Sequence, residues 1–137
     1  MRRPGAVATG AAVIAILLAA CSTGSSGTPE PTGPVVVTFE LNEGERFRAL
    51  LTETDDIAAA RRLLSGEIAP DIPNGRIVRE TGVNEGWSWS LDPADFEFAE
   101  VTTEVCDGLP SDVESGAITS DRYCPWSARV IAVDQAP

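Results

Sequence analysis

The stretch of residues 86–126 places the strongest constraint on the fold, because it contains all three tryptophans and two of the three cysteines. Trp87, Trp89 and Leu91 alternate with polar residues at its start, and residues 99–106 alternate between apolar and polar side chains further on. Apolar residues at every second position are typical of a β-strand with one buried face. We therefore predict two strands in this stretch, the second ending at the first of the two cysteines.

Residues 1–20 have the composition of an export signal. Two arginines precede an apolar stretch that is too short and too close to the N-terminus for a membrane-spanning helix. It ends in Leu18-Ala19-Ala20-Cys21, which resembles the lipobox of bacterial lipoproteins: a leucine three positions before a cysteine, with small residues between. The resemblance implies that the leader is cut before Cys21 and that the Cys21 thiol carries a diacylglyceryl group. An ordinary secretory signal, in which Cys21 is incidental, is the alternative.

A lipid at Cys21 would hold the protein at the cell membrane, on its extracytoplasmic face, since two or more acyl chains anchor stably where one is marginal. Residues 21–34 are rich in Ser, Thr, Gly and Pro, so we predict that they form a flexible tether. The remaining residues 35–137 have about the commonest size of a single domain. The sequence thus divides into a lipoprotein signal peptide, a tether and one domain.

Cysteine parity favours a disulfide between Cys106 and Cys124. Three cysteines would leave an odd thiol in an exported protein, but a lipid on Cys21 removes one from the count. The other two can then pair in an oxidising compartment. Two separately buried thiols are the alternative. A zinc site is disfavoured, since the sequence has no histidine and no CxxC spacing.

The chain is strongly acidic, with 10 cationic side chains, all of them arginine, against 21 acidic ones. Removal of the leader takes away Arg2 and Arg3 and no acid, which leaves 8 against 21 and a net charge of −13. Because binding to phosphates requires cationic surface, we expect no nucleic-acid partner. The same charge argues against a domain face docked on an anionic membrane.

The order of the predicted elements favours an α+β fold. Strands are predicted over residues 35–41, 46–51, 76–81, 87–91, 96–106 and 126–133, and helices over residues 55–65 and 111–115. Thr52 or Thr54 can cap the first helix at its start, and Gly66 can cap its end. Prolines and an Asn-Gly pair predict a loop over residues 69–75, and Asp92-Pro93-Ala94-Asp95 predicts a strand break. Neighbouring hairpins predict a mostly antiparallel sheet of about six strands with two helices and one disulfide.

Several phrases of the sequence resemble a small domain found in bacterial secreted proteins. These phrases are Phe47-Arg48-Ala49-Leu50-Leu51-Thr52, Ile72-Pro73-Asn74-Gly75-Arg76-Ile77, Asn84-Glu85-Gly86-Trp87-Ser88-Trp89-Ser90-Leu91, Val105-Cys106-Asp107-Gly108 and Pro110-Ser111-Asp112-Val113-Glu114. The domain is similar to the N-terminal domain of a calmodulin-binding protein from social amoebae, over residues 35–133. The resemblance implies no activity. Calmodulin binding is not expected here, because the chain has no basic amphipathic helix.

The residue types argue against catalysis. Without histidine, Ser-His and Cys-His mechanisms are excluded. Hydrolysis by paired carboxylates needs two suitably placed acids, and six acids lie close together in sequence: Asp92, Asp95, Glu97, Glu100, Glu104 and Asp107. In a chain this acidic such a cluster is usually a solvated face. A calcium loop of the DxDxDG type is absent, so we expect neither a metal site nor a cofactor.

The tryptophan stripe allows two interpretations. It is either the buried face of a sheet, covered by the helix over residues 55–65, or an aromatic platform for sugars or peptides. We predict that Trp89 is buried. Trp87, next to a glycine at the strand end, is the better candidate for contact with a partner, together with Asn84 and Asp92.

These features favour a lipid-anchored surface protein that acts as a non-enzymatic binding or interaction module for an unknown protein or glycan ligand. The alternative is a small carboxylate-dependent hydrolase, and a structural envelope protein without a ligand is a third possibility. No catalytic residue can be named from the sequence, and neither the ligand nor the oligomeric state can be deduced from it.

Overall fold

The domain begins with a β-hairpin that the sequence predicted. The computed structural model describes residues 32–137; the predicted leader, Cys21 and most of the tether lie outside the described residues. Strands β1 (Val35–Glu40) and β2 (Arg46–Leu51) pair antiparallel, and every second side chain of each strand is buried. Gly44, with φ at 86°, makes the tight turn between them possible. No helix among the described residues is long and apolar enough to cross a membrane.

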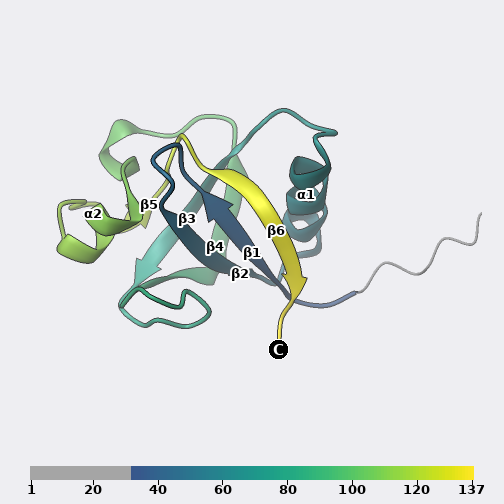
Figure 1. Cartoon of the computed structure of the whole chain (residues 1–137), viewed down its shortest axis with the longest axis horizontal. Coiled ribbons are helices and arrows are strands. Elements are labelled where there is room, and N and C mark those ends of the chain that lie inside the picture. Colours follow the sequence, from purple (N-terminus) through teal and green to yellow (C-terminus); the bar gives the residue numbers. More distant parts are fainter. Residues whose placement is uncertain (1–31) are drawn as a thin grey trace, which may run out of the picture. The chain divides into compact units, whose positions relative to one another are not determined.

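Six strands form two three-stranded antiparallel sheets (Figure 1). Strand β6 (Arg129–Gln135) pairs with the free side of β1, which gives the order β2-β1-β6. In the second sheet, β3 (Ile72–Val78) lies between β4 (Ser90–Ala99) and the short β5 (Arg122–Tyr123). The predicted α+β fold with six antiparallel strands, two helices and one disulfide is confirmed; the strands divide into two sheets.

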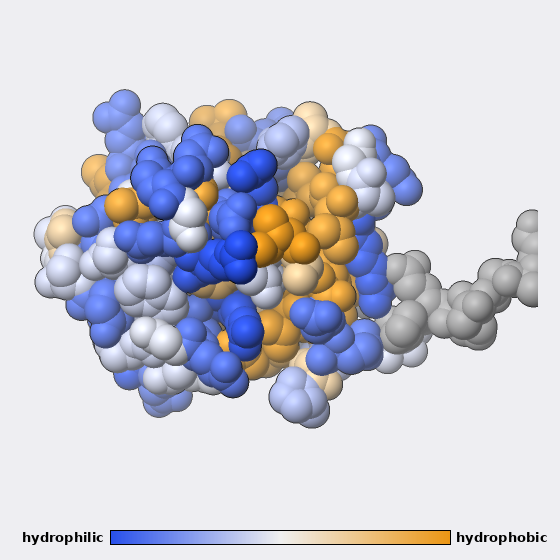
Figure 2. All heavy atoms as spheres, viewed as in Figure 1, coloured by the Kyte–Doolittle hydropathy of each residue, from blue (hydrophilic) through white to orange (hydrophobic). Residues whose placement is uncertain are grey.

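Helix α1 (Thr54–Ser65) follows β2 and packs against β6 and β4; Figure 1 shows it beside β6, with α2 (Pro110–Ser115) on the other side of the domain. Gly66 caps α1 in the left-handed conformation, as predicted. The predicted threonine caps are wrong, because Glu53 occupies the N-cap position and makes no side-chain cap bond. Figure 2 shows apolar side chains gathered on the side of the domain where β6 and α1 lie.

The core is an aromatic cluster between the two sheets. Phe39 and Phe47 of the first sheet stack at a centroid distance of 4.8 Å, and Phe47 lies 5.3 Å from Tyr123 of the second. Trp89 contacts both Phe47 and Tyr123, at 6.0 and 5.3 Å. The prediction that Trp89 is buried is therefore confirmed, and the rings of Phe47 and Tyr123 contribute to its cover.

The region of the tryptophans differs from the predicted strands. Residues 87–89 belong to a loop, and β4 starts at Ser90 and continues through the predicted break to Ala99. Pro93 is tolerated because β4 pairs with β3 on one side only, so the missing N–H can fall on the unpaired side. The carbonyl of Pro93 accepts a hydrogen bond from the Thr52 hydroxyl at 3.5 Å.

The predicted loop over residues 69–75 is also wrong in its second half, because β3 begins at Ile72. Strand β5 pairs only with Gly75 and Arg76, so Pro73 lies beyond its end and need not donate a hydrogen bond there. A Cβ atom on Gly75 would lie 3.2 Å from the Leu91 side chain. The glycine therefore allows β3 and β4 to approach closely and does not make a turn.

The predicted long strand ending at Cys106 is wrong as well. The chain leaves the sheet after Ala99, and Glu104–Cys106 forms a short 3₁₀ turn, η1. Alternation alone does not make a strand where no neighbouring strand is available to pair. The segment is fixed by the predicted disulfide, in which the Cα atoms of Cys106 and Cys124 lie 5.1 Å apart. The Cys124 amide also donates to the Cys106 carbonyl at 2.8 Å.

The disulfide should contribute a large share of the stability. It joins residues 18 positions apart, and a loop of this length corresponds to about 3 kcal/mol in the chain-entropy account. Domains of this kind have a total stability of about 5–15 kcal/mol. We expect the double variant Cys106→Ser, Cys124→Ser to melt clearly below the parent in thermal denaturation followed by circular dichroism. Cys21→Ser, which leaves the disulfide intact, is the control. Unchanged melting of the double variant would contradict the assignment.

Candidate functional site

Asn84 organises the loop between β3 and β4. Its side chain is fully buried: Oδ1 accepts a hydrogen bond from the Arg48 amide at 2.8 Å, and Nδ2 donates to the Trp89 carbonyl at 2.9 Å. Its backbone closes two turns, with the Asn84 amide donating to Thr81 and the Trp87 amide donating to Asn84. Asn84 therefore fixes the loop against β2 and has no surface to offer a ligand in this conformation.

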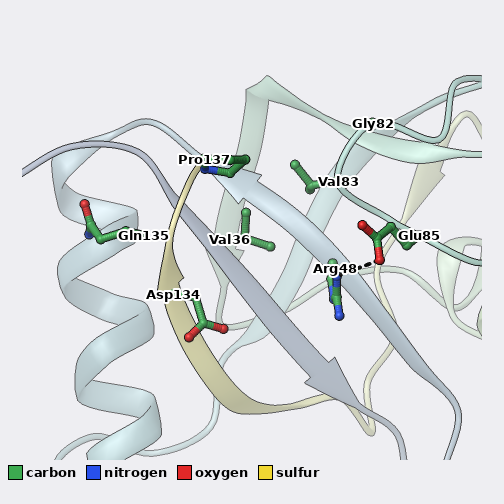
Figure 3. A pocket seen from close by; sticks show the side chains of 8 residues that line it. All are labelled: Val36, Arg48, Gly82, Val83, Glu85, Asp134, Gln135 and Pro137. Atoms are coloured by element: carbon green, nitrogen blue, oxygen red, sulfur yellow. Dashed lines mark hydrogen bonds and ion pairs between the residues drawn. The ribbon is translucent and has the colours of Figure 1, made fainter.

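A hollow of about 330 Å³, here called the Arg48 hollow, lies between this loop and the outer face of the β2-β1-β6 sheet. Its lining residues are Val36, Arg48, Gly82, Val83, Glu85, Asp134, Gln135 and Pro137. Figure 3 shows Val83 and Glu85 of the loop facing Val36 and Arg48 of the sheet. The Arg48 guanidinium pairs with the Glu85 carboxylate at 3.4 Å, and both side chains are largely exposed, so a ligand can compete for either.

A second hollow of about 390 Å³, here called the Asp92 hollow, lies on the other side of the same turn. It is lined by Leu50, Val78, Glu80, Gly82, Val83, Ser90, Leu91, Asp92 and Pro93. The two hollows share Gly82 and Val83, so this turn separates two parts of one surface region. Gly82 has φ at 51°, and a Cβ there would lie 3.2 Å from the Ser90 hydroxyl, which explains the glycine.

Of the three predicted binding residues, only Asp92 lines a hollow. Trp87 is half-buried, its indole N–H donates to the Arg46 carbonyl at 2.9 Å, and its ring lies 6.3 Å from that of Trp89. It therefore fastens the loop to β2. A binding role for Trp87 and Asp92 stays a prediction, and the structure does not bring the two together with Asn84 on one exposed platform.

The acids that the sequence grouped together are in part held by arginines. Asp92 pairs with Arg76, and Asp95 accepts hydrogen bonds from Arg122 at 3.0 and 3.1 Å. The Ala94 amide, which donates to Asp92, and then Arg76 hold the pKa of the Asp92 carboxyl below its usual value. Among the described residues no group of three or more Cys, Asp or Glu side chains is arranged to hold a metal ion.

Sequence reasoning missed most of the lining residues. Arg48 and Val36 lie on neighbouring strands, and only the pairing of β1 with β2 brings them to one face. Asp134 and Pro137 join them because β6 returns to β1 at the end of the chain. Val83 was the one available signal, since it is an apolar residue in a turn that otherwise contains small and polar residues.

The comparison with protein families gives one result. The family model for the N-terminal domain of the calmodulin-binding protein matches residues 33–137, which is nearly all of the described part of the chain. This confirms the resemblance that the sequence phrases indicated. Searches of curated proteins and of solved structures returned no match.

The role of Asn84 can be tested by removing its amide. In Asn84→Ala, the Arg48 N–H and the Trp89 carbonyl both lose a buried partner, and each orphaned group costs about 1–3 kcal/mol. We expect a clear loss of stability in urea denaturation followed by tryptophan fluorescence. The neighbouring Glu85→Ala removes only an exposed ion pair and should change stability by about 0–1 kcal/mol. Equal stability of the two variants would show that Asn84 does not organise the loop.

Proposed function

This chain belongs to the family of calmodulin-binding protein N-terminal domains, and we propose that it acts as a lipid-anchored, non-enzymatic binding module on the extracytoplasmic face of the cell membrane. The observation that carries the proposal is the pair of adjoining hollows around Gly82 and Val83. Their volumes, about 330 and 390 Å³, fall within the range of small-molecule sites, and their lining combines apolar and charged side chains.

The cysteines support the anchor. Cys106 and Cys124 are bonded to each other, which leaves Cys21 as the one cysteine available for acylation. A structural disulfide also fits an oxidising compartment outside the cytoplasm. The lipobox-like Leu18-Ala19-Ala20-Cys21 and the Ser/Thr/Gly/Pro-rich segment that follows it complete the argument from sequence.

The carboxylates support a binding role over hydrolysis. A general acid needs a carboxyl with a raised pKa, whereas the pKa of Asp92, which lines one of the hollows, is lowered. Burial raises the pKa of Asp56, but this residue lies in the first turn of α1 and lines neither hollow. A carboxylate-dependent hydrolase would require these directions to be reversed.

The lining indicates a small amphipathic ligand. In the Arg48 hollow, Val36, Val83 and Pro137 supply carbon surface, while Arg48 and the carboxylates beside it supply hydrogen-bonding groups of both kinds. Short peptides and sugars combine apolar faces with polar groups in this way. We therefore propose a peptide or glycan fragment as the ligand.

The binding proposal is tested by a titration. The mature lipoprotein in detergent is titrated with a panel of cell-wall oligosaccharides and short peptides, and tryptophan fluorescence is followed because Trp87 belongs to the loop that borders both hollows. We expect at least one compound to bind with a Kd below about 1 mM, and Val83→Asp to weaken it at least about tenfold. Ile131→Asp, at an exposed apolar position outside both hollows, should bind as the parent does. Binding that Val83→Asp leaves unchanged, or no binding by any compound, would contradict the proposal.

The anchoring proposal has its own test. Cys21→Ala removes the thiol that would carry the lipid, so the protein should leave the membrane fraction or accumulate as uncut precursor. Cell fractionation and the mass of the N-terminal peptide report both outcomes. A variant that is still processed and still bound to the membrane would refute the lipid anchor.

A further inference from the structure

Three apolar side chains, here called the Trp126 patch, are exposed beside the disulfide. Val101 is 84% exposed, Val105 69% and Trp126 46%. Single exposed apolar residues are common on protein surfaces, but these three lie on two chain segments that one covalent bond joins. Val105 directly precedes Cys106, and Trp126 follows Cys124 by two positions.

The patch is held in place by specific bonds. The indole N–H of Trp126 donates to the Thr102 hydroxyl at 2.7 Å, which places the ring next to the segment that carries Val101. The backbone amide of Trp126 donates to the Asp107 carboxylate at 2.8 Å. Since these bonds and the disulfide fix the groups before a partner arrives, binding costs little conformational entropy. Tryptophan is also among the residues that contribute most to protein interfaces.

The Trp126 patch is separate from the two hollows. Strand β1 runs from Pro34, where the Ala136 amide pairs with its carbonyl, to Asn42, whose amide donates to the Ser127 hydroxyl at 3.5 Å. Its six residues span about 20 Å. The Arg48 hollow includes Val36 near the start of β1, whereas the residue after Trp126 lies near its far end. The patch therefore presents a second surface.

The charge around the patch restricts what can cover it. Between Arg79 and Arg122 the sequence contains 11 acidic residues and no cationic one, and Glu100 and Glu104 flank the valines of the patch and are exposed. A second copy of this chain would carry the same net charge of −13 and be repelled. An anionic bilayer would be repelled for the same reason. A cationic protein segment is attracted.

We propose that the Trp126 patch is a docking surface for a cationic protein segment. An apolar side chain of the partner packs on Trp126 and the two valines, and its arginines or lysines face Glu100 and Glu104. This interaction goes beyond the proposed binding in the hollows and depends neither on them nor on the lipid at Cys21. A failure here therefore leaves the earlier proposals untouched, and the reverse also holds.

The test measures binding of a defined peptide to the full lipoprotein in nanodiscs of phosphatidylcholine, a lipid without net charge. The probe is a short peptide of alternating arginine and leucine; peptides of alternating arginine and glycine and of alternating glutamate and leucine are the controls. Biolayer interferometry, with empty nanodiscs subtracted, gives the affinities. We expect the arginine-leucine peptide to bind with a Kd of about 1–100 μM, and both control peptides to bind at least about tenfold more weakly.

Matched variants locate the binding. Trp126→Ala and Val105→Ser should each weaken the arginine-leucine peptide at least about threefold. Leu64→Ser, which removes an equally exposed apolar side chain from α1, should leave binding unchanged. The pair Glu100→Gln, Glu104→Gln should weaken binding and reduce its dependence on salt. Circular dichroism checks that each variant is folded, and Val105 is exposed enough that its truncation leaves the core intact.

Three outcomes would overturn the proposal. One is binding of the arginine-leucine peptide that survives Trp126→Ala and Val105→Ser unchanged, which would reduce it to general attraction between opposite charges. Another is equal binding of the glutamate-leucine peptide. The third is a dimer of the lipoprotein in sedimentation that Trp126→Ala dissociates, since the patch would then be covered by a second copy.

Discussion

Phe47, Trp89 and Tyr123 come from β2, from the loop before β4 and from β5, and their rings meet at centroid distances of 5.3–6.0 Å. Neither three-stranded sheet can bury its apolar face alone, so the domain depends on this contact. The indole N–H of Trp89 is buried without a hydrogen-bond partner among the described residues. That omission costs about 1–3 kcal/mol, whereas burying about 150–250 Å² of aromatic surface at about 25 cal/mol per Å² contributes about 4–6 kcal/mol. Packing therefore outweighs the unsatisfied donor.

The position of Trp89 also determines where the candidate site lies. A tryptophan held between the sheets fixes its own carbonyl, and Asn84 uses that carbonyl and the Arg48 amide to close the loop. The loop then places Val83 over the sheet, which produces the two hollows. Polar and apolar interactions thus have different roles here: the ring contacts join the sheets, and one buried amide shapes the surface beside them.

The sequence predicted those parts of the fold in which local pattern and tertiary structure agree. The β1–β2 hairpin has alternating side chains and its own turn, and Gly66 ends α1 where a glycine cap is expected. Parity identified the disulfide because it depends only on counting cysteines. Patterns were misleading where distant partners decide the outcome. Gly75 looked like part of a turn, yet it is required by the approach of Leu91 from another strand.

The candidate site was less predictable for the same reason. Asn84 was selected as a polar residue near tryptophans, and that proximity is real, but its amide serves the domain's own backbone. Asp92 was selected as an acid next to a strand and does line a hollow. Arg48 and Val36 meet only through strand pairing, which no local pattern encodes.

The alternating segment of residues 99–106 shows how one pattern can have two origins. In a strand, every second apolar residue faces the core, and the sequence here has that spacing. The disulfide instead draws Cys106 toward β5, so the chain turns at η1 while Val101 and Val105 remain exposed. Exposed valines contribute nothing to the core, and they do not stabilise a strand that is never formed. Their presence next to an exposed tryptophan, on the most rigidly held loop of an otherwise polar and acidic region, is accounted for if that surface is covered by a partner of opposite charge.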